Sequence, residues 1–342
     1  MTLQAFQSSD IFQQFFIDQL AQMLEHEQLG VFILVLANAL SRKQIHQPLA
    51  NALQQRFEQL RTQLGKLPEA QRQSIPADDL DVFRALERIG LETFSSAEAR
   101  DAGCWKLQYH PLRSLRPARN SARAVTLLKQ PFDEQAFHFN KAFLHKEILW
   151  QGEIGRTDVR LLYNKFPFAD FHGLLVIDGA AGKPQFLQQA DCVAAQQVFE
   201  HLSNKTALGM AYNSLGAYAS VNHQHWQTFL SDETYPIENL QWQHNGGTEN
   251  YPLEVEVYAS LSQAWTEIDR LQRQNIAFNL FIRGTRIWLT KRRRQGDYTH
   301  SDWTAGFAWS ETAGSLMTTR REDFLMLKVA QIEQEFQRLR ID

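Results

Sequence analysis

The chain has 342 residues, 44% of them hydrophobic, and a formal net charge of −3 at pH 7. This length supplies enough apolar side chains for one large core or for two smaller ones. The slight negative charge provides no overall positive field for a nucleic-acid partner. The two cysteines form no C-x-x-C pair, which argues against a disulfide framework and a cysteine-based zinc site and fits a reducing compartment.

The N-terminus has no basic segment followed by an apolar block, which is the pattern of a secretory signal. The most apolar run, residues 30–40, is far shorter than the roughly 20 residues that a membrane span needs. We therefore expect a cytoplasmic protein with no membrane partner, in which residues 30–40 form a buried helix.

Residues 10–66 carry apolar side chains at helical spacing, and a shorter helix is expected over residues 78–89. A polar loop, Pro68–Pro76, separates the two patterns. Nothing in this part of the chain connects to chemistry. We interpret residues 1–100 as an added helical region, either a cap or an oligomerisation surface; a homodimer is one assembly that it would allow.

From Ala124 onward the pattern changes to short apolar runs that are typical of strands. The predicted strands cover residues 125–128, 147–150, 159–164, 173–178, 208–212 and 253–258. Helices are expected over residues 188–203 and 261–271. A C-terminal helix should turn five apolar residues inward: Leu325, Val329, Ile332, Phe336 and Leu339.

The clearest hairpin joins residues 277–282 to residues 285–290 through a turn at Arg283–Gly284. The dense basic run 291–294 follows it and is interpreted as a solvated hairpin end, with a phosphate or nucleic-acid contact as the alternative. Hairpins beside scattered helices predict an α+β fold with a mainly antiparallel sheet flanked by helices.

Residues 213–227, N-S-L-G-A-Y-A-S-V-N-H-Q-H-W-Q, are the stretch in which we expect the chemistry. His223, His225 and Gln227 would share one face of an extended strand. The small and polar residues before them can bring backbone N–H groups and hydroxyls close to an anion. An imidazole that faces a phosphate-binding loop suggests nucleotidyl or phosphoryl transfer.

A neutral imidazole nitrogen can attack an α-phosphorus when an acceptor holds its other nitrogen, which fixes the tautomer. His225 is the candidate nucleophile, and Gln227 could only orient groups by hydrogen bonding, which suits an acceptor other than water. Spacing alone leaves open that the two histidines are a metal site or a chance pair. A zinc site would need a third ligand, for which the candidates are His172, His201 and Glu254.

The segment around these histidines resembles the signature of the GDP-L-galactose and GDP-D-glucose phosphorylases. These belong to the transferase branch of the histidine-triad (HIT) superfamily, together with galactose-1-phosphate uridylyltransferase. Further segments resemble the family in the same order: residues 130–141, 162–176, 275–282 and 307–316. The resemblance covers about residues 105–335 and implies a HIT-like nucleotidyltransferase domain over residues 101–342.

The resemblance also implies residue roles. His225 would carry the nucleotidyl group, His223 would support it, and Gln227 would contact the phosphates. The implied substrate- and phosphate-binding residues are Asn213, Ser214, Gly216, Ser220, Lys141, Asn164, His172 and Glu311. The sequence departs from the family pattern at two places: Ser315 replaces a family histidine, and F-H-F-N-K stands where the family has F-N-F-T-K. These departures bear on the identity of the substrate more than on the class of reaction.

The implied activity is that of a nucleotidyltransferase that needs no cofactor or metal. It would convert a GDP-hexose and inorganic phosphate to hexose 1-phosphate and GDP through a covalent His225–nucleotidyl intermediate. Two alternatives remain: a diadenosine polyphosphate phosphorylase or hydrolase of the same superfamily, and a non-catalytic nucleotide-binding protein.

Overall fold

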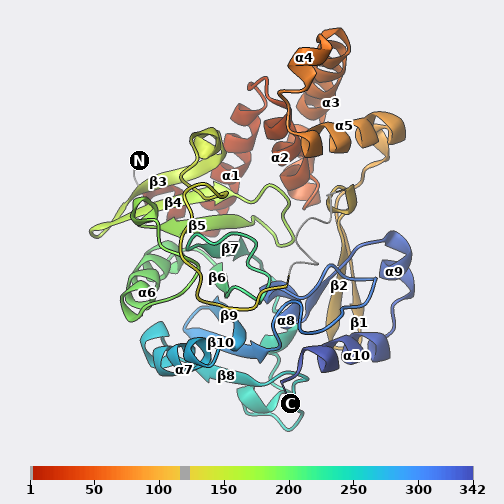
Figure 1. The fold of residues 1–342 in the computed structure, drawn as a ribbon. Coiled ribbons are helices and arrows are strands. Elements are labelled where there is room, and N and C mark those ends of the chain that lie inside the picture. Colours follow the sequence, from red (N-terminus) through yellow and green to blue (C-terminus); the bar gives the residue numbers. More distant parts are fainter. Residues whose placement is uncertain (1–2, 116–123, 342) are drawn as a thin grey trace.

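The computed structural model describes residues 3–115 and 124–341 and contains two β-sheets among helices (Figure 1). An eight-stranded antiparallel sheet has the order β3-β4-β5-β7-β6-β9-β10-β8, and a three-stranded sheet has the order β1-β2-β11. The strands are β1 (Glu98–Ala102), β2 (Trp105–Tyr109), β3 (Ile148–Ile154), β4 (Thr157–Tyr163), β5 (Gly173–Ile177), β6 (Leu208–Asn213), β7 (Trp226–Leu230), β8 (Val255–Tyr258), β9 (Ala277–Arg283), β10 (Arg286–Arg292) and β11 (Ser315–Thr318).

Most of the helices lie before the first strand or beside the large sheet (Figure 1). They are α1 (Ser9–Met23), α2 (Leu29–Ala39), α3 (Lys43–Lys66), α4 (Glu69–Arg72), α5 (Ala77–Ile89), α6 (Gln189–Ser203), α7 (Leu261–Arg273), α8 (Trp309–Thr312), α9 (Arg321–Met326) and α10 (Val329–Leu339). In the described parts of the chain, no helix is long and apolar enough to span a bilayer.

The two faces of the large sheet are covered differently. One face packs with helices α1, α2, α6 and α7 in the largest apolar cluster. The opposite face carries two separate clusters, one around Phe139, Leu162 and Val176 and one around Phe281 and Trp309. Because alternate residues of a strand point to opposite faces, a cross-strand row on this second face runs from one cluster to the other: Leu162, Leu174, Gln227, Ala211 and Phe281. Gln227 therefore lies between the two clusters.

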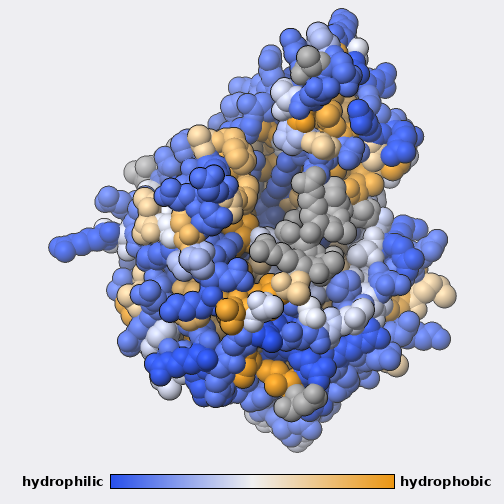
Figure 2. Space-filling view, in the orientation of Figure 1, coloured by the Kyte–Doolittle hydropathy of each residue, from blue (hydrophilic) through white to orange (hydrophobic). Residues whose placement is uncertain are grey.

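The N-terminal helices share a core with the large sheet. The ring of Phe16 on α1 lies 4.6 Å from that of Tyr163 and 5.3 Å from that of Phe171, between centroids. The Tyr163 hydroxyl donates to the Phe16 carbonyl at 2.6 Å. Helices α3–α5 project from this body, and the face in Figure 2 is hollowed below them. The division into residues 1–100 and 101–342 stays a prediction.

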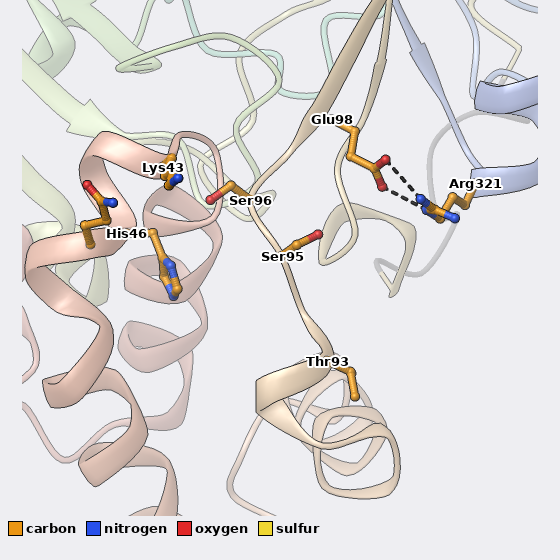
Figure 3. A pocket seen from close by; sticks show the side chains of 8 residues that line it. Lys43, His46, Thr93, Ser95, Ser96, Glu98 and Arg321 are labelled. Atoms are coloured by element: carbon orange, nitrogen blue, oxygen red, sulfur yellow. Dashed lines mark hydrogen bonds and ion pairs between the residues drawn. The ribbon is translucent and has the colours of Figure 1, made fainter.

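The connection from these helices to the small sheet runs beside a surface depression (Figure 3). Lys43 and His46 of α3, Thr93, Ser95 and Ser96 of the connection, and Arg321 of α9 are among the residues that line it. Glu98 at the start of β1 accepts two hydrogen bonds from the Arg321 guanidinium, at 2.8 and 3.1 Å. This bidentate pair joins β1 to α9.

The α+β fold with a mainly antiparallel sheet is confirmed, as are the predicted helices that became α2, α5, α6 and α7. Residues 125–128 are not a strand, and residues 223–225 precede β7 instead of extending it. The hairpin pairs Arg283 with Arg286, so its turn falls one residue later than predicted.

Two predictions about surface and core are wrong. Leu325 lies in the separate short helix α9 and is 52% exposed, because the C-terminal helical pattern is broken before α10. Lys291 and Arg292 are buried, not solvated. Lys291 is surrounded by the carboxylates of Glu254, Glu256 and Glu267, which compensate for the burial of its charge.

Candidate active site

His225 is held by hydrogen bonds that leave one ring nitrogen available. It precedes β7 and is 3% exposed. Its Nδ1 lies 2.8 Å from the carbonyl oxygen of His223. A carbonyl only accepts, so Nδ1 carries the proton and donates, and Nε2 keeps its lone pair. Among the described residues, none makes a hydrogen bond to this Nε2.

The backbone of His225 is fixed by a side chain that the sequence did not single out. Gln185, which is 1% exposed, accepts from the His225 N–H at 2.8 Å and donates to its carbonyl at 3.1 Å. The same amide also donates to the Asn213 carbonyl at 2.9 Å. Gln185 thus ties the end of β6 to the residue before β7.

His223 uses both ring nitrogens within the protein. Its Nδ1 accepts from the Phe139 N–H at 3.1 Å, and its Nε2 donates to the Gly179 carbonyl at 3.1 Å. The Phe139 ring also packs against the His225 ring, with centroids 5.0 Å apart. These contacts support His225 from two loops and leave His223 no free nitrogen with which to react.

Gln227 accepts two hydrogen bonds at one atom. Its Oε1 lies 2.8 Å from Nε2 of His172 and 2.7 Å from Nε1 of Trp309. His172 is fully buried, and its Nδ1 accepts from the Phe168 N–H at 3.2 Å, so its Nε2 is the protonated nitrogen. The amide nitrogen of Gln227 makes no hydrogen bond with the described part of the chain.

Asn213 repeats this arrangement at the end of β6. Its Oδ1 accepts from Nδ2 of Asn279 at 2.7 Å and from the Trp309 N–H at 2.9 Å. Its Nδ2 is buried and has no hydrogen-bond partner in the described ranges. A buried donor without a hydrogen-bond acceptor is rare in proteins and calls for an explanation.

Burial lowers the pKa of His225 to about 4, that of His223 to about 4 and that of His172 to about 3. All three are therefore neutral at pH 7. Burial also raises the pKa of Glu311, although the charges of Arg113 and Arg292 oppose that rise. A neutral imidazole is the form that can attack phosphorus.

The other predicted site residues differ in whether they bond to this network. Asn164 joins it, because its backbone N–H donates to the His172 carbonyl at 3.1 Å. The Ser214 hydroxyl accepts from the Phe278 N–H within the sheet, and Glu311 caps α8 by accepting from the Ala308 N–H. Lys141 donates to the Glu134 carbonyl.

Gly216 and Ser220 lie in the loop between β6 and β7. Gly216 has φ +79°, which favours glycine, and its carbonyl accepts from the Gln295 N–H at 2.6 Å. Ser220 is exposed. No hydrogen bond between described residues links Ser220 or Lys141 to His225.

The described residues contain no group of three or more histidine, cysteine or acidic side chains arranged to hold a metal ion. His201 is on the exposed side of α6, where its Nδ1 lies 3.0 Å from the Gln197 carbonyl oxygen, and Glu254 pairs with Lys291. Neither lies in the hydrogen-bond network of His223 and His225.

Comparison with known proteins places this site in context. Residues 106–229 match the family model described as GDPGP1-like, N-terminal domain. GDP-D-glucose phosphorylase 1 of Macaca fascicularis is 31% identical over 127 residues, which are 35% of this chain and 33% of that protein. GDP-L-galactose phosphorylase 2 of Arabidopsis thaliana is 27% identical over 244 residues, 58% of this chain and 56% of that protein. The chain thus aligns with between a third and about half of the length of these relatives.

The fold has a counterpart among solved structures. Yeast Ap4A phosphorylase Apa2 in complex with Ap4A superimposes with a TM-score of 0.51 at 16% identity, over 77% of this chain and 96% of that chain. This similarity confirms the HIT-like fold expected from the sequence. The resemblance to the GDP-hexose phosphorylases is confirmed as well, because residues 106–229 match a GDPGP1-like N-terminal domain model and the chain is similar in sequence to relatives that carry these names.

Proposed function

We propose that this protein is a GDP-hexose phosphorylase that works by double displacement at His225. The observation that carries the proposal is the hydrogen bond from His225 Nδ1 to the His223 carbonyl, which directs the lone pair to a free Nε2. The named relatives act on GDP-sugars of two kinds, GDP-D-glucose and GDP-L-galactose.

In the first step Nε2 of His225 attacks the α-phosphorus of the GDP-hexose. The N–P bond forms as the bridging P–O bond to the β-phosphate breaks, and hexose 1-phosphate leaves. In the second step an oxygen of inorganic phosphate attacks the same phosphorus and the N–P bond breaks. GDP leaves, and His225 returns to its neutral form.

The surrounding residues have supporting roles in this proposal. The amide groups of Asn213 and Gln227 donate to the non-bridging phosphate oxygens, where negative charge accumulates in each transition state. Gln185 and the His223 carbonyl hold His225 in place. Phosphate contacts by Ser214, Gly216, Ser220, Lys141, Asn164 and Glu311 stay predictions, as does a homodimer.

Product analysis tests this function. GDP-glucose, GDP-mannose and GDP-L-galactose are each incubated with the protein, with and without inorganic phosphate, and the products are separated by chromatography. We expect GDP and hexose 1-phosphate to form only when phosphate is present. Release of ADP or ATP from a diadenosine polyphosphate, with no GDP from any GDP-hexose, would contradict the proposal and favour the dinucleotide alternative.

A further inference from the structure

Trp309 contacts both candidate phosphate-binding carboxamides through two different N–H groups. Its backbone N–H donates to Asn213 Oδ1 at 2.9 Å, and its indole Nε1–H donates to Gln227 Oε1 at 2.7 Å. Asn213 is on β6 and Gln227 on β7, whereas Trp309 begins α8. One residue from outside these strands therefore touches two side chains next to His225.

These contacts settle which way each carboxamide faces. Backbone N–H and indole N–H groups only donate, so the atom that each one contacts must be the carbonyl oxygen. Each oxygen has a second donor as well: His172 Nε2 for Gln227 and Asn279 Nδ2 for Asn213. With both oxygens doubly occupied, the two NH₂ groups are directed away from Trp309.

The two NH₂ groups also lack partners within the described parts of the chain. The NH₂ group of Asn213 is buried, and leaving a buried donor without an acceptor costs about 1–3 kcal/mol. This arrangement therefore calls for a compensating ligand. The Gln185 amide donates to the carbonyls of both Asn213 and His225, which places these two residues side by side, and Gln227 is two residues after His225. The unpartnered donors therefore flank the proposed nucleophile.

We propose that Trp309 is a positioning residue that aims the NH₂ groups of Asn213 and Gln227 at the non-bridging oxygens of the nucleotide phosphate. This inference rests on the proposed function. The indole bond to Gln227 is the part that a side-chain substitution can remove, because the backbone bond to Asn213 stays in any variant. Trp309 itself touches no reacting atom in this account.

Trp309→Phe tests the inference, since phenylalanine keeps an aromatic ring but loses the indole N–H. Trp226→Phe is the matched control. Trp226 is a buried tryptophan in the adjacent position to Gln227, on the other face of β7, and its Nε1 has no hydrogen-bond partner in the described structure. We expect Trp309→Phe to lower kcat by about tenfold to a hundredfold with a smaller change in KM, and Trp226→Phe to change kcat by less than about threefold.

A double-mutant cycle separates orientation from packing. In a Gln227→Met background the indole N–H has no carboxamide to orient, so adding Trp309→Phe should lower kcat by less than about threefold. An equal loss in both backgrounds, or equal losses for Trp309→Phe and Trp226→Phe, would overturn the positioning role.

The affinity for GDP, measured by calorimetry, is a second measurement of the effect of Trp309→Phe that does not depend on turnover. We expect Trp309→Phe to weaken GDP binding several-fold and Trp226→Phe to leave it unchanged. A wild-type protein that binds GDP without turning over any GDP-hexose would contradict the proposed function, while the affinities would still decide the role of Trp309. Unchanged GDP affinity in Trp309→Phe, with active wild type, would overturn the inference alone.

Discussion

The carbonyl oxygen of His223 lies 2.8 Å from Nδ1 of His225, so each histidine of the pair has a different task. The backbone of His223 fixes the tautomer of His225, and the His223 ring is bonded to Phe139 and Gly179. A pair of metal ligands would instead need a ring nitrogen free on each histidine. Only His225 has one.

Replacing Gln227 with glutamate tests the direction of its amide. The two donors, His172 and Trp309, would hold one carboxylate oxygen as they hold Oε1. The second oxygen, now negatively charged, would face the phosphates where an NH₂ group stood. We expect kcat/KM to fall by about a hundredfold or more, and to fall further than in Gln227→Met, which removes the donor without adding a charge. A glutamate variant more active than the methionine variant would contradict this orientation.

The buried histidines should make the protein less stable in mild acid. A histidine in the unfolded chain has a pKa near 6.5, whereas burial lowers the pKa of His225 and His223 to about 4 and that of His172 to about 3. The unfolded state therefore binds more protons below pH 6.5. The free energy of unfolding should fall as pH drops from 6.5 towards 4, by up to about 1.4 kcal/mol per pH unit for each histidine.

Urea unfolding at pH 7, 6 and 5 measures this dependence. His110 offers a control, because burial lowers its pKa to about 4 as well and its Nε2 contacts the Ala37 carbonyl on α2, not the His225 network. In His110→Gln the free energy of unfolding should depend less steeply on pH, because one of the histidines that bind a proton on unfolding is absent. A slope that is flat in wild type, or unchanged in this variant, would contradict the prediction.

The contact between α1 and the sheet predicts that the N-terminal helices and the sheet unfold together. Phe16 is fully buried against Tyr163 and Phe171, so Phe16→Ala should lower the free energy of unfolding by about 3–5 kcal/mol. Ile11→Ala, on the same helix at a side chain that is 44% exposed, should cost about 1 kcal/mol or less. Circular dichroism and tryptophan fluorescence should report one transition. Two separated transitions, with Phe16→Ala shifting only the first, would show that the helices form an independent unit.

Local patterns were sufficient to predict most of the large sheet and its helices. Strands such as β5 and β9 are largely apolar because both of their faces are buried, and α7 shows its apolar stripe in the sequence. The hairpin of β1 and β2 was missed because β1, E-A-R-D-A, has almost no apolar residues, and β11 was missed because it pairs in parallel with β2 from about 200 residues away, residues 315–318 with 106–109. Such a pairing leaves no local signal. The burial of Lys291 and Arg292 was missed for the same reason, since their partners come from other elements.

The residues of the candidate site were likewise predictable only in part. The spacing of His223, His225 and Gln227 is visible in the sequence, as is the segment of small and polar residues before them. Gln185 and Trp309 are not recognisable from spacing, because their roles depend on hydrogen bonds to distant strands. The one available signal for Trp309 was its position in the segment 307–316, which resembles the phosphorylase family.

Intact-protein mass spectrometry of a trapped intermediate tests the central claim most directly. Three proteins are each mixed with a panel of nucleoside-diphosphate sugars in phosphate-free buffer: wild type, His225→Ala and His201→Ala. His201→Ala is the control, because it removes an exposed histidine of α6. We predict a GMP adduct on wild type and His201→Ala, none on His225→Ala, and loss of the adduct when phosphate is added. An adduct that persists in His225→Ala, or no adduct on wild type with any sugar nucleotide, would contradict a covalent mechanism at His225.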